Sequence, residues 1–353
     1  MGKKAGQAIN KGFDLAGVRG RVQGFGDLNL QPPVSPINTG AGFSPCIRAG
    51  STSLKEGLAF SDLCFILVST TVGTDSYDYS ALSGLLTEIN AHAVSNKNFV
   101  ICSTHSPEFI QNTAAPLLRD CANATVSYNP PFIAQGEIFN GIRKPDMVLI
   151  GEGSPEAGEL LESIYKRVCL NFPYIARMSV KSAEIAKLGL NCFLTAKIAL
   201  ANLIGDIADE TPGADKFAIL NAIGKDQRIG SKYIRPGYGF GGPCFPRDNC
   251  ALGNYALSKG LEPVIFRATD EANRQHAKYL AGQFLEQGLN EYVFEDVSYK
   301  QNSPSDIIEA SQKLLVAQLV AEQGKRVTLL DRESVLSQIK NKHGDLFNYE
   351  IKR

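Results

Sequence analysis

Short apolar runs alternate with a stretch of helical periodicity in the first half of the chain. Residues 63–68 and 99–102 are nearly continuous apolar runs, as expected of strands buried on both faces, and residues 148–151 form a third. Between the first two runs, residues 80–92 place apolar side chains at helical spacing. This strand–helix–strand order predicts an open α/β sheet.

The middle of the chain predicts one long helix over residues 182–210. This stretch has no proline, and its apolar residues recur around the whole helix, so it must be buried in a core or against a partner subunit. We expect it to pack against its two-fold mate in a homodimer. Lys187 and Asn191 are four residues apart and therefore share a face of this helix. A buried lysine can transfer protons or stabilise an oxyanion, whereas the commoner alternative is a lysine that reaches solvent.

The pattern changes again after residue 248. Residues 253–286 read as two helices broken near Gly260 and Pro263, and residues 310–323 form an amphipathic helix that ends at Gly324. Residues 326–331 then read as a strand that ends in Asp331. An acidic residue at the end of a strand is typical of the ribose-binding position in dinucleotide folds.

A cysteine lies in the most informative segment, between a glycine pair and two charged residues. Gly241 and Gly242 precede Cys244, and Arg247 and Asp248 follow it. Glycines let the backbone approach a substrate closely, and a thiol beside a cation ionises more readily to the nucleophilic thiolate. If the chain is helical from residue 245, Asp248 shares a face with Cys244 and can steer a proton or a water. The alternative is a buried structural thiol.

Composition excludes several classes of protein. The chain has 353 residues, enough for two or three domains, and its 36 basic residues balance its 36 acidic ones, which argues against a nucleic-acid partner. No apolar run has the length that predicts a membrane span. The start of the chain has no signal-peptide pattern. Eight scattered cysteines without metal-ligand spacing predict free thiols in a cytoplasmic protein, and no metal site.

Three sequence blocks together resemble one enzyme family. They contain Arg228-Ile229-Gly230 with the segment from Tyr233 to Asp248, Ala183-Glu184 with Lys187 and Asn191, and Asn129-Pro130-Pro131-Phe132 with the strand that ends at Gly151. In this order they resemble the UDP-glucose/GDP-mannose dehydrogenase family. Weaker similarities lie at Ser103-Thr104, Asn273-Arg274-Gln275 and Tyr299-Lys300, so that the resemblance covers about residues 50 to 335.

The resemblance implies a function, a cofactor and a set of catalytic residues. Such an enzyme uses NAD to oxidise the primary alcohol of a nucleotide sugar to a carboxylate in two hydride transfers. Cys244 would form a thiohemiacetal and then a thioester, which water hydrolyses. Lys187 and Asn191 would hold the oxyanion, Asp248 would handle a proton or a water, and Thr104 would orient that water.

The resemblance also implies binding residues. Those expected to bind the substrate are Phe132, Arg228, Tyr233, Gly241 and Gly242, with Arg228 reaching across a dimer interface. Those expected to contact NAD are Thr70, Thr104, Arg247 and Lys300. Thr70 and Thr104 follow strand ends, where the alternative is ordinary turn chemistry. UDP-glucose is the favoured substrate, and GDP-mannose is the alternative.

The sequence departs from the family pattern in two places. The family begins with a strand, a G-x-G-x-x-G turn and a helix that hold the dinucleotide pyrophosphate. Here Gly24-Phe25-Gly26 is only a G-x-G in an expected loop, and this first unit is expected to be missing. The family glutamates of the substrate loop are replaced by Pro131 and Gln135, and Glu137 is a possible substitute. These departures favour the rival hypothesis of a non-catalytic nucleotide-sugar-binding homologue or a gene fragment.

The expected architecture is therefore an α/β fold with three parts. A truncated Rossmann-like NAD-binding domain spans residues 1–172, and a central helical dimerisation domain with the cysteine loop spans residues 173–288. A short C-terminal α/β domain over residues 289–353 would hold the nucleotide of the substrate.

Overall fold

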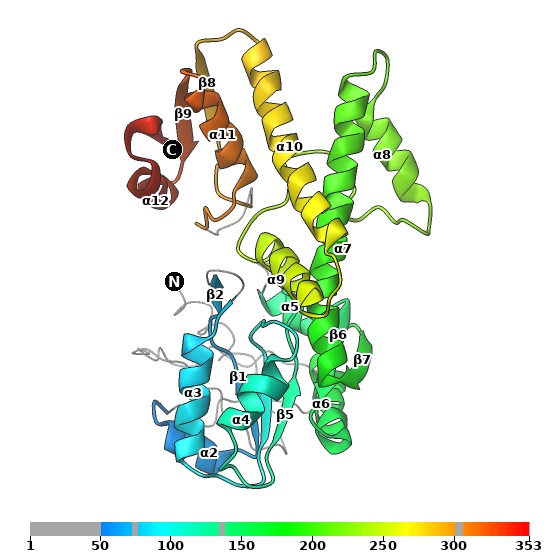
Figure 1. The fold of residues 1–353 in the computed structure, drawn as a ribbon, viewed down its shortest axis with the longest axis vertical. Coiled ribbons are helices and arrows are strands. Elements are labelled where there is room, and N and C mark those ends of the chain that lie inside the picture. Colours follow the sequence, from blue (N-terminus) through cyan, green and yellow to red (C-terminus); the bar gives the residue numbers. More distant parts are fainter. Residues whose placement is uncertain (1–50, 73–76, 134–137, 301–305, 353) are drawn as a thin grey trace. The chain divides into compact units, whose positions relative to one another are not determined.

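The computed structural model describes residues 51–72, 77–133, 138–300 and 306–352. Gly24-Phe25-Gly26, Gln135 and Glu137 lie outside the described residues. The chain forms two compact units, of which the first ends at Lys187 and the second begins at Leu188. The long helix α7 (Val180–Asp209) belongs to both, because the division falls within it (Figure 1).

The first unit is built on a five-stranded sheet in the order β1-β4-β5-β6-β7. The strands are β1 (Leu63–Ile66), β4 (Asn98–Ile101), β5 (Thr125–Tyr128), β6 (Met147–Glu152) and β7 (Tyr174–Ser179). β1, β4 and β5 are parallel, so their carboxyl ends meet in one row of Ile66, Ile101 and Tyr128. Strands β2 (Thr71–Val72) and β3 (Tyr77–Asp78) form a separate pair.

The expectation of parallel strands is wrong for β6, which runs antiparallel to β5 through Tyr128 and Gly151. A parallel neighbour needs a crossover, usually a helix packed on the sheet. The described part of the connection instead contains α5 (Ile138–Arg143), which is six residues long and buries none of them.

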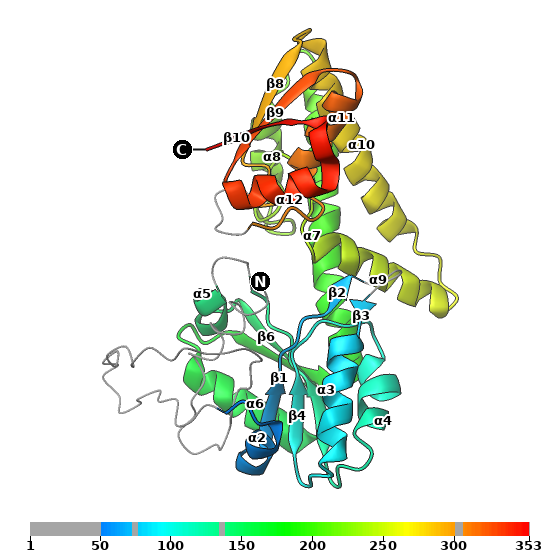
Figure 2. The ribbon, with the colours of Figure 1, turned by 90° about the vertical axis from the view of Figure 1, so that its left-hand side faces the viewer.

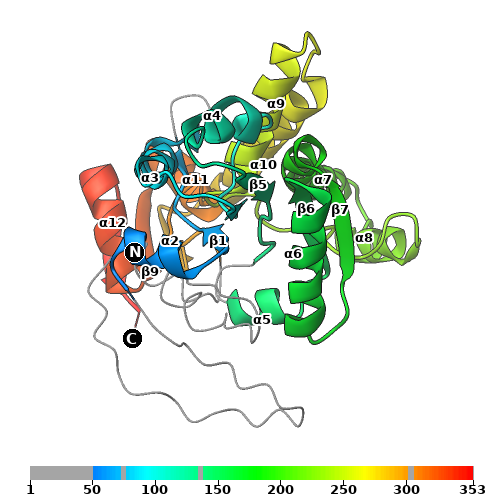
Figure 3. The ribbon, with the colours of Figure 1, turned by 90° about the horizontal axis from the view of Figure 1, so that it is seen from below.

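Helices cover both faces of this sheet (Figure 3). On one face, α3 (Ser80–Ala91) buries Leu82, Leu86 and Ile89 at the spacing that the sequence predicted. The same core includes α2 (Leu54–Phe60), η1 (Ile110–Ala114) and α4 (Ala115–Leu117). On the other face, α6 (Pro155–Val168) packs Leu161 and Ile164 against Val100 and Ile150. α6 begins where Ser154 caps the helix and Pro155 occupies its first turn.

The second unit combines helices with a three-stranded parallel sheet in the order β10-β9-β8 (Figure 2). The strands are β8 (Glu291–Glu295), β9 (Arg326–Asp331) and β10 (Asn348–Ile351), and β9 has the bounds that the sequence predicted. The helices are α8 (Lys216–Lys225), α9 (Phe245–Ser258), α10 (Val264–Glu286), α11 (Gln312–Glu322) and α12 (Glu333–His343), followed by the short η2 (Gly344–Leu346). The sheet, α10, α11 and α12 share one hydrophobic core. The predicted break near Gly260 and Pro263 separates α9 from α10.

α7 is the one helix of the described residues that is long and apolar enough to cross a membrane. Length and composition alone do not distinguish such a span from the core helix of a soluble protein, and α7 carries Lys187 and Lys197. The absence of a membrane partner therefore stays a prediction.

Candidate active site

Cys244 lies at the N-terminus of α9 in the second unit. The helix begins at Phe245 with a proline in its first turn, and the Asp248 N–H donates to the Cys244 carbonyl at 2.8 Å. The segment after Cys244 is therefore helical, as the sequence pattern required. The Cys244 side chain is exposed, and the partial positive charge at a helix N-terminus favours a thiolate at this position.

Asp248, one turn after Cys244, is a buried carboxylate held by two side chains. It is 1% exposed, and the Asn191 side-chain amide donates to it at 2.6 Å. The Arg247 guanidinium lies 3.5 Å from its other oxygen. Because a buried carboxylate is stable only when it is paired, Asn191 and Arg247 fix where this charge lies. Two of the predicted catalytic residues, Asn191 and Asp248, are thus in direct contact.

The glycines before Cys244 pack against the protein itself. A Cβ at Gly241 would lie 2.0 Å from the Ala310 carbonyl oxygen, and one at Gly242 would lie 2.5 Å from the Tyr299 ring. Gly242 also has a φ of +80°, and its N–H donates to the Glu309 carbonyl at 3.1 Å. Glycine is required here because backbone and ring occupy the space that a side chain would need. The loop that carries Cys244 is thereby fixed to the segment between β8 and α11.

Lys187 lies in the first unit, one helical turn before Asn191 on α7. Its side chain is buried, its ammonium group lies 3.4 Å from the Pro131 carbonyl oxygen, and it lies 4.4 Å from the centre of the Phe132 ring. A cation over an aromatic face is attracted by the ring quadrupole. The functional alternative for Lys187, a buried ammonium rather than a solvated one, agrees with this geometry. The structure thus brings Phe132, predicted to bind the substrate, next to Lys187.

Two hydroxyl residues meet at the carboxyl ends of β1 and β4. The Thr70 hydroxyl donates to the Thr104 carbonyl at 2.8 Å, and the Ser103 hydroxyl bridges the backbone N–H and carbonyl of Val68. Ligands of open α/β sheets bind beyond the carboxyl ends of the strands. Hydroxyl and backbone groups at this edge are the neutral donors and acceptors that suit the ribose and amide groups of NAD. The Thr70 hydroxyl and the Thr104 carbonyl bind each other at this edge, and their contact with NAD stays a prediction.

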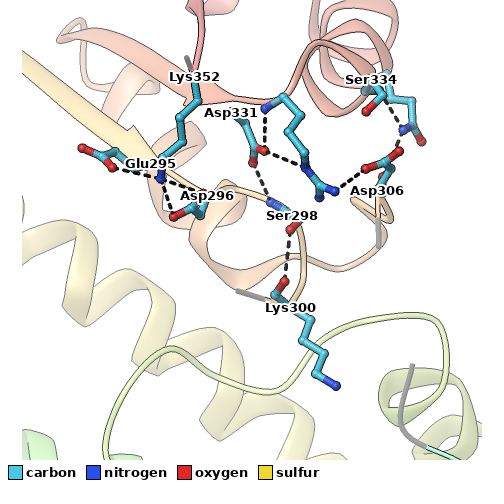
Figure 4. A network of polar contacts seen from close by, with 10 residues as sticks. Glu295, Asp296, Ser298, Lys300, Asp306, Asp331, Ser334 and Lys352 are labelled. Atoms are coloured by element: carbon cyan, nitrogen blue, oxygen red, sulfur yellow. Dashed lines mark hydrogen bonds and ion pairs between the residues drawn. The ribbon is translucent and has the colours of Figure 1, made fainter. Parts of the chain in front are cut away.

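The remaining predicted residues are less closely tied to these groups. Arg228 is exposed and forms a bidentate ion pair with Asp226 at 3.0 and 2.7 Å. Tyr233 is half exposed and has a φ of +65°. Lys300 contributes its carbonyl to Ser298, and its side chain points away from the polar network of the C-terminal sheet (Figure 4).

That polar network lies at the carboxyl ends of the three parallel strands (Figure 4). Asp331 at the end of β9 accepts from the Ser298 N–H at 3.3 Å, and Arg332 bridges Asp331 and Asp306. Lys352, after β10, pairs with Asp296 at 2.9 Å and with Glu295 at 3.3 Å. Asp331, which the sequence singled out as a ribose-type acid, is therefore engaged within the protein.

An apolar cavity of about 60 Å³ lies in the first unit. It is lined by Pro131, Phe132, Cys102 and Tyr165 among other residues. Ligand sites usually have volumes of at least about 300 Å³, so this cavity alone is too small for a nucleotide sugar.

Several residues of the second unit that contact the cysteine loop were not predicted as site residues, although Asn273 and Tyr299 lie in segments of weaker family similarity. Asn202, Asn273 and His276 bind the backbone of residues 237–240, and the Tyr299 ring contacts Gly242. Asn191 and Asn202, together with Thr195 and Asp206, are polar positions in the largely apolar helix α7. Their spacing of four, seven and four residues marks one face of α7, and this was the signal available in the sequence.

Comparison with known proteins identifies the family of the chain. Residues 47–169 match the NAD binding domain of the UDP-glucose/GDP-mannose dehydrogenase family, and residues 181–275 match its central domain. The chain belongs to the UDP-glucose/GDP-mannose dehydrogenase family, which confirms the resemblance and the Rossmann-like α/β fold.

Individual relatives are similar over part of their length. A putative UDP-glucose 6-dehydrogenase of Bacillus subtilis is 31% identical over 83% of this chain and 69% of its own length. The UDP-glucose 6-dehydrogenase of Pseudomonas aeruginosa is 32% identical over 65% of this chain and 52% of its own. The chain thus spans between about half and about two thirds of these curated relatives. A UDP-glucose dehydrogenase structure from Pyrobaculum islandicum has a TM-score of 0.76 and 30% identity, and covers 86% of this chain and 71% of its own.

Proposed function

We propose that this protein is an NAD-dependent nucleotide-sugar dehydrogenase that oxidises the primary alcohol of its substrate to a carboxylate. UDP-glucose, giving UDP-glucuronate, is the favoured substrate, and GDP-mannose is the alternative. One observation carries the proposal. The Cys244 thiol is exposed at a helix N-terminus, and Asp248, one helical turn later, is buried and bound by Asn191. Family membership and the match to the NAD binding domain support the cofactor.

The residues of this chain supply the covalent part of the reaction. NAD, when bound, accepts a hydride in each of two oxidations and would lie against Thr70 and Thr104. The Cys244 thiolate adds to the carbonyl carbon of the aldehyde, and the resulting oxyanion takes a proton to give a thiohemiacetal. Loss of the carbon-bound hydrogen as hydride, with loss of the hydroxyl proton, converts this adduct into a thioester. Water then adds to the thioester carbon, and the C–S bond breaks to give the carboxylate and free Cys244.

Three groups assist these steps through charge or hydrogen bonds. Lys187, a buried cation in the described structure, and the Asn191 amide are donors for an oxyanion on the reacting carbon. Asp248 is an acceptor for a proton from the attacking water. Asn191 donates to Asp248, so these two roles are linked through one hydrogen bond.

The activity is tested by NADH formation from full-length chain with UDP-glucose or GDP-mannose. Cys250 provides a matched control, since it is also an exposed thiol of α9. C244S should abolish carboxylate production and C250S should preserve it. NADH formation by C244S at the wild-type rate through both oxidations would refute the proposal.

A non-catalytic nucleotide-sugar-binding homologue is the second candidate. The observation that favours it is that the Lys187 ammonium meets the Pro131 carbonyl at the place where the family has a glutamate. A chain of this kind would bind UDP-glucose in calorimetry and give no NADH with either sugar nucleotide.

We also propose that the protein is a homodimer in the cytoplasm. In the second unit, α7 exposes Phe193, Leu200, Leu203 and Ile207, at spacings of seven, three and four residues. This spacing forms an apolar stripe on one face of the helix, which is the pattern of a helix that packs against a partner. A second copy of α7 presents the same stripe, so a two-fold pairing would cover both.

A further inference from the structure

Side chains from two helices of the second unit bind the backbone of the loop that leads to Cys244. The Asn202 side chain of α7 accepts from the Gly237 N–H at 3.1 Å. The Asn273 side chain of α10 accepts from the Phe240 N–H at 2.8 Å and donates to the Phe240 carbonyl at 2.9 Å. Both asparagines are buried, so these bonds are shielded from competing water.

His276 binds the same loop and also pairs with Asp206. Its Nδ1 lies 2.8 and 3.0 Å from the two carboxylate oxygens of Asp206, and its Nε2 lies 2.7 Å from the Gly237 carbonyl oxygen. Both neighbours are acceptors, whereas a neutral imidazole has only one N–H. Only the imidazolium can donate to both at once. The His276 side chain is 6% exposed, so a broken bond is not readily replaced by water.

The other acidic groups near the His276–Asp206 pair have partners of their own. Further along α7, Asp209 pairs with Lys216 of α8 at 2.6 Å. Glu210 accepts from the Tyr279 hydroxyl of α10 at 2.9 Å, and Tyr238 lies in the loop itself. Asp206 therefore faces His276, while the neighbouring acids have other partners.

We propose that the charged His276–Asp206 pair is a positioning device for Cys244, holding the loop at Gly237 so that the thiol stays at the N-terminus of α9. Gly241 and Gly242 are fixed on the other side by Ala310 and Tyr299, so residues 237–242 are held at both ends. His276 does not touch the reacting atoms in this scheme and acts through the loop. The inference rests on the proposed role of Cys244.

Thiol labelling tests this role without requiring enzyme activity. The full-length chain is treated with iodoacetamide in the absence of NAD and sugar, and digested with trypsin. Cleavage after Arg247 separates the Cys244 peptide from the Cys250 peptide, so the ratio of the two labelling rates is read in one sample. Cys250 corrects for changes in reagent and in overall α9 exposure, because both thiols are exposed at α9.

The H276Q variant should lower the Cys244-to-Cys250 labelling ratio by about tenfold, because one donor is lost and the thiol leaves the helix N-terminus. D206N should give a similar fall, and the double variant should fall no further, since both act on one unit.

Thermal unfolding of each variant separates folding from positioning. A purely structural role would lower the melting temperature and leave the labelling ratio of the folded protein unchanged, which would overturn the inference. A ratio that stays at the wild-type value or rises in H276Q would overturn it as well. If the chain gives no NADH, the proposed function fails, but the labelling ratio still decides whether His276 positions Cys244.

Discussion

The Asn191 amide lies 2.6 Å from the Asp248 carboxylate, and both side chains are buried. The bond joins α7 to the first turn of α9, the helix that begins just after Cys244. A single contact therefore links the two predicted catalytic segments of the second unit. Removal of one partner leaves a buried polar group unsatisfied, and the predicted effect can be measured on stability as well as on activity.

N191A should lower the free energy of unfolding by about 1–3 kcal/mol, because the Asp248 carboxylate then loses a buried donor. It should also reduce kcat for NADH formation if Asn191 holds an oxyanion. Urea denaturation measures the first effect and steady-state kinetics the second. Asn254 on the exposed side of α9 is the matched control, and N254A should change both quantities little. Equal stability losses for the two variants would contradict the assignment of the buried pair.

Cys244 should be labelled by iodoacetamide before the buried thiols. Burial raises the pKa of Cys192 and of Cys102 to about 12, and raises that of Cys64 to about 11. These thiols therefore carry little thiolate at neutral pH, whereas Cys244 and Cys250 are exposed. Among the seven cysteines of the described residues, peptide mapping after brief alkylation should find label on Cys244 and Cys250 only. Early label on Cys192 would show that the site opens in solution.

His105 should make the first unit sensitive to acid. It is fully buried against Phe109 and Tyr128, and burial lowers its pKa to about 4. In the unfolded chain its pKa is about 6.5, so the unfolded state binds a proton between these values while the folded state does not. Stability from neutral His105 is complete above pH ~6.5 and is lost as the pH falls towards 4, by up to about 3 kcal/mol.

Comparison of wild type with H105N isolates this contribution. Glu184, whose carboxylate accepts from the Ile110 N–H at 3.1 Å, has a pKa raised by burial and so responds to pH in the opposite sense. Because the Glu184 carboxylate lies 3.6 Å from His105 Nδ1, H105N also changes the surroundings of Glu184, and the comparison is therefore repeated in an E184Q background, which removes this response. The difference in unfolding free energy should shrink as the pH falls from 7 to 4. A flat difference for H105N would contradict the predicted shift.

The sequence predicted the helices and strands whose buried residues follow a regular local pattern. β1, α3, β4 and β9 have apolar runs or regular periodicity, and each lies within a few residues of its predicted bounds. β5 and β7 were missed because they mix polar and apolar residues, as in Thr125–Tyr128. The antiparallel pairing of β6 depends on the path of a connection, which periodicity does not encode.

The residues of the candidate site were likewise predicted only in part. Cys244 and Asp248 were predicted from their sequence context, and Lys187 and Asn191 from the family resemblance; the structure pairs Asn191 with Asp248. His276 and Asp206 were missed because they are 70 residues apart and neither lies in a recognised motif. Contacts between distant residues follow from the crossing of α7 and α10, and no local rule gives that crossing.

A charge placed in the apolar stripe of α7 should weaken dimerisation. Leu200 is 59% exposed in the single chain, and L200E would place a carboxylate at the centre of the proposed interface. Light scattering should show a dimer for wild type and a monomer, or a markedly weaker dimer, for L200E. L261E is the control, because Leu261 is similarly exposed but lies in the turn between α9 and α10. A wild-type protein that is monomeric at micromolar concentration would rule the interface out.

The two glycines before Cys244 should differ sharply from a third glycine in the same loop. In G241A the new methyl group would overlap the Ala310 carbonyl, and in G242A it would overlap the Tyr299 ring at a backbone φ of +80°. Each variant must move the loop, and we expect a loss of about 1–3 kcal/mol of stability together with slower NADH formation. A Cβ at Gly237 would meet no heavy atom within 4 Å, and Gly237 has no positive φ, so G237A should be nearly neutral. Thermal unfolding of the three variants tests this order, and a G237A as damaging as G241A would show that loop flexibility, rather than close packing, requires the glycines.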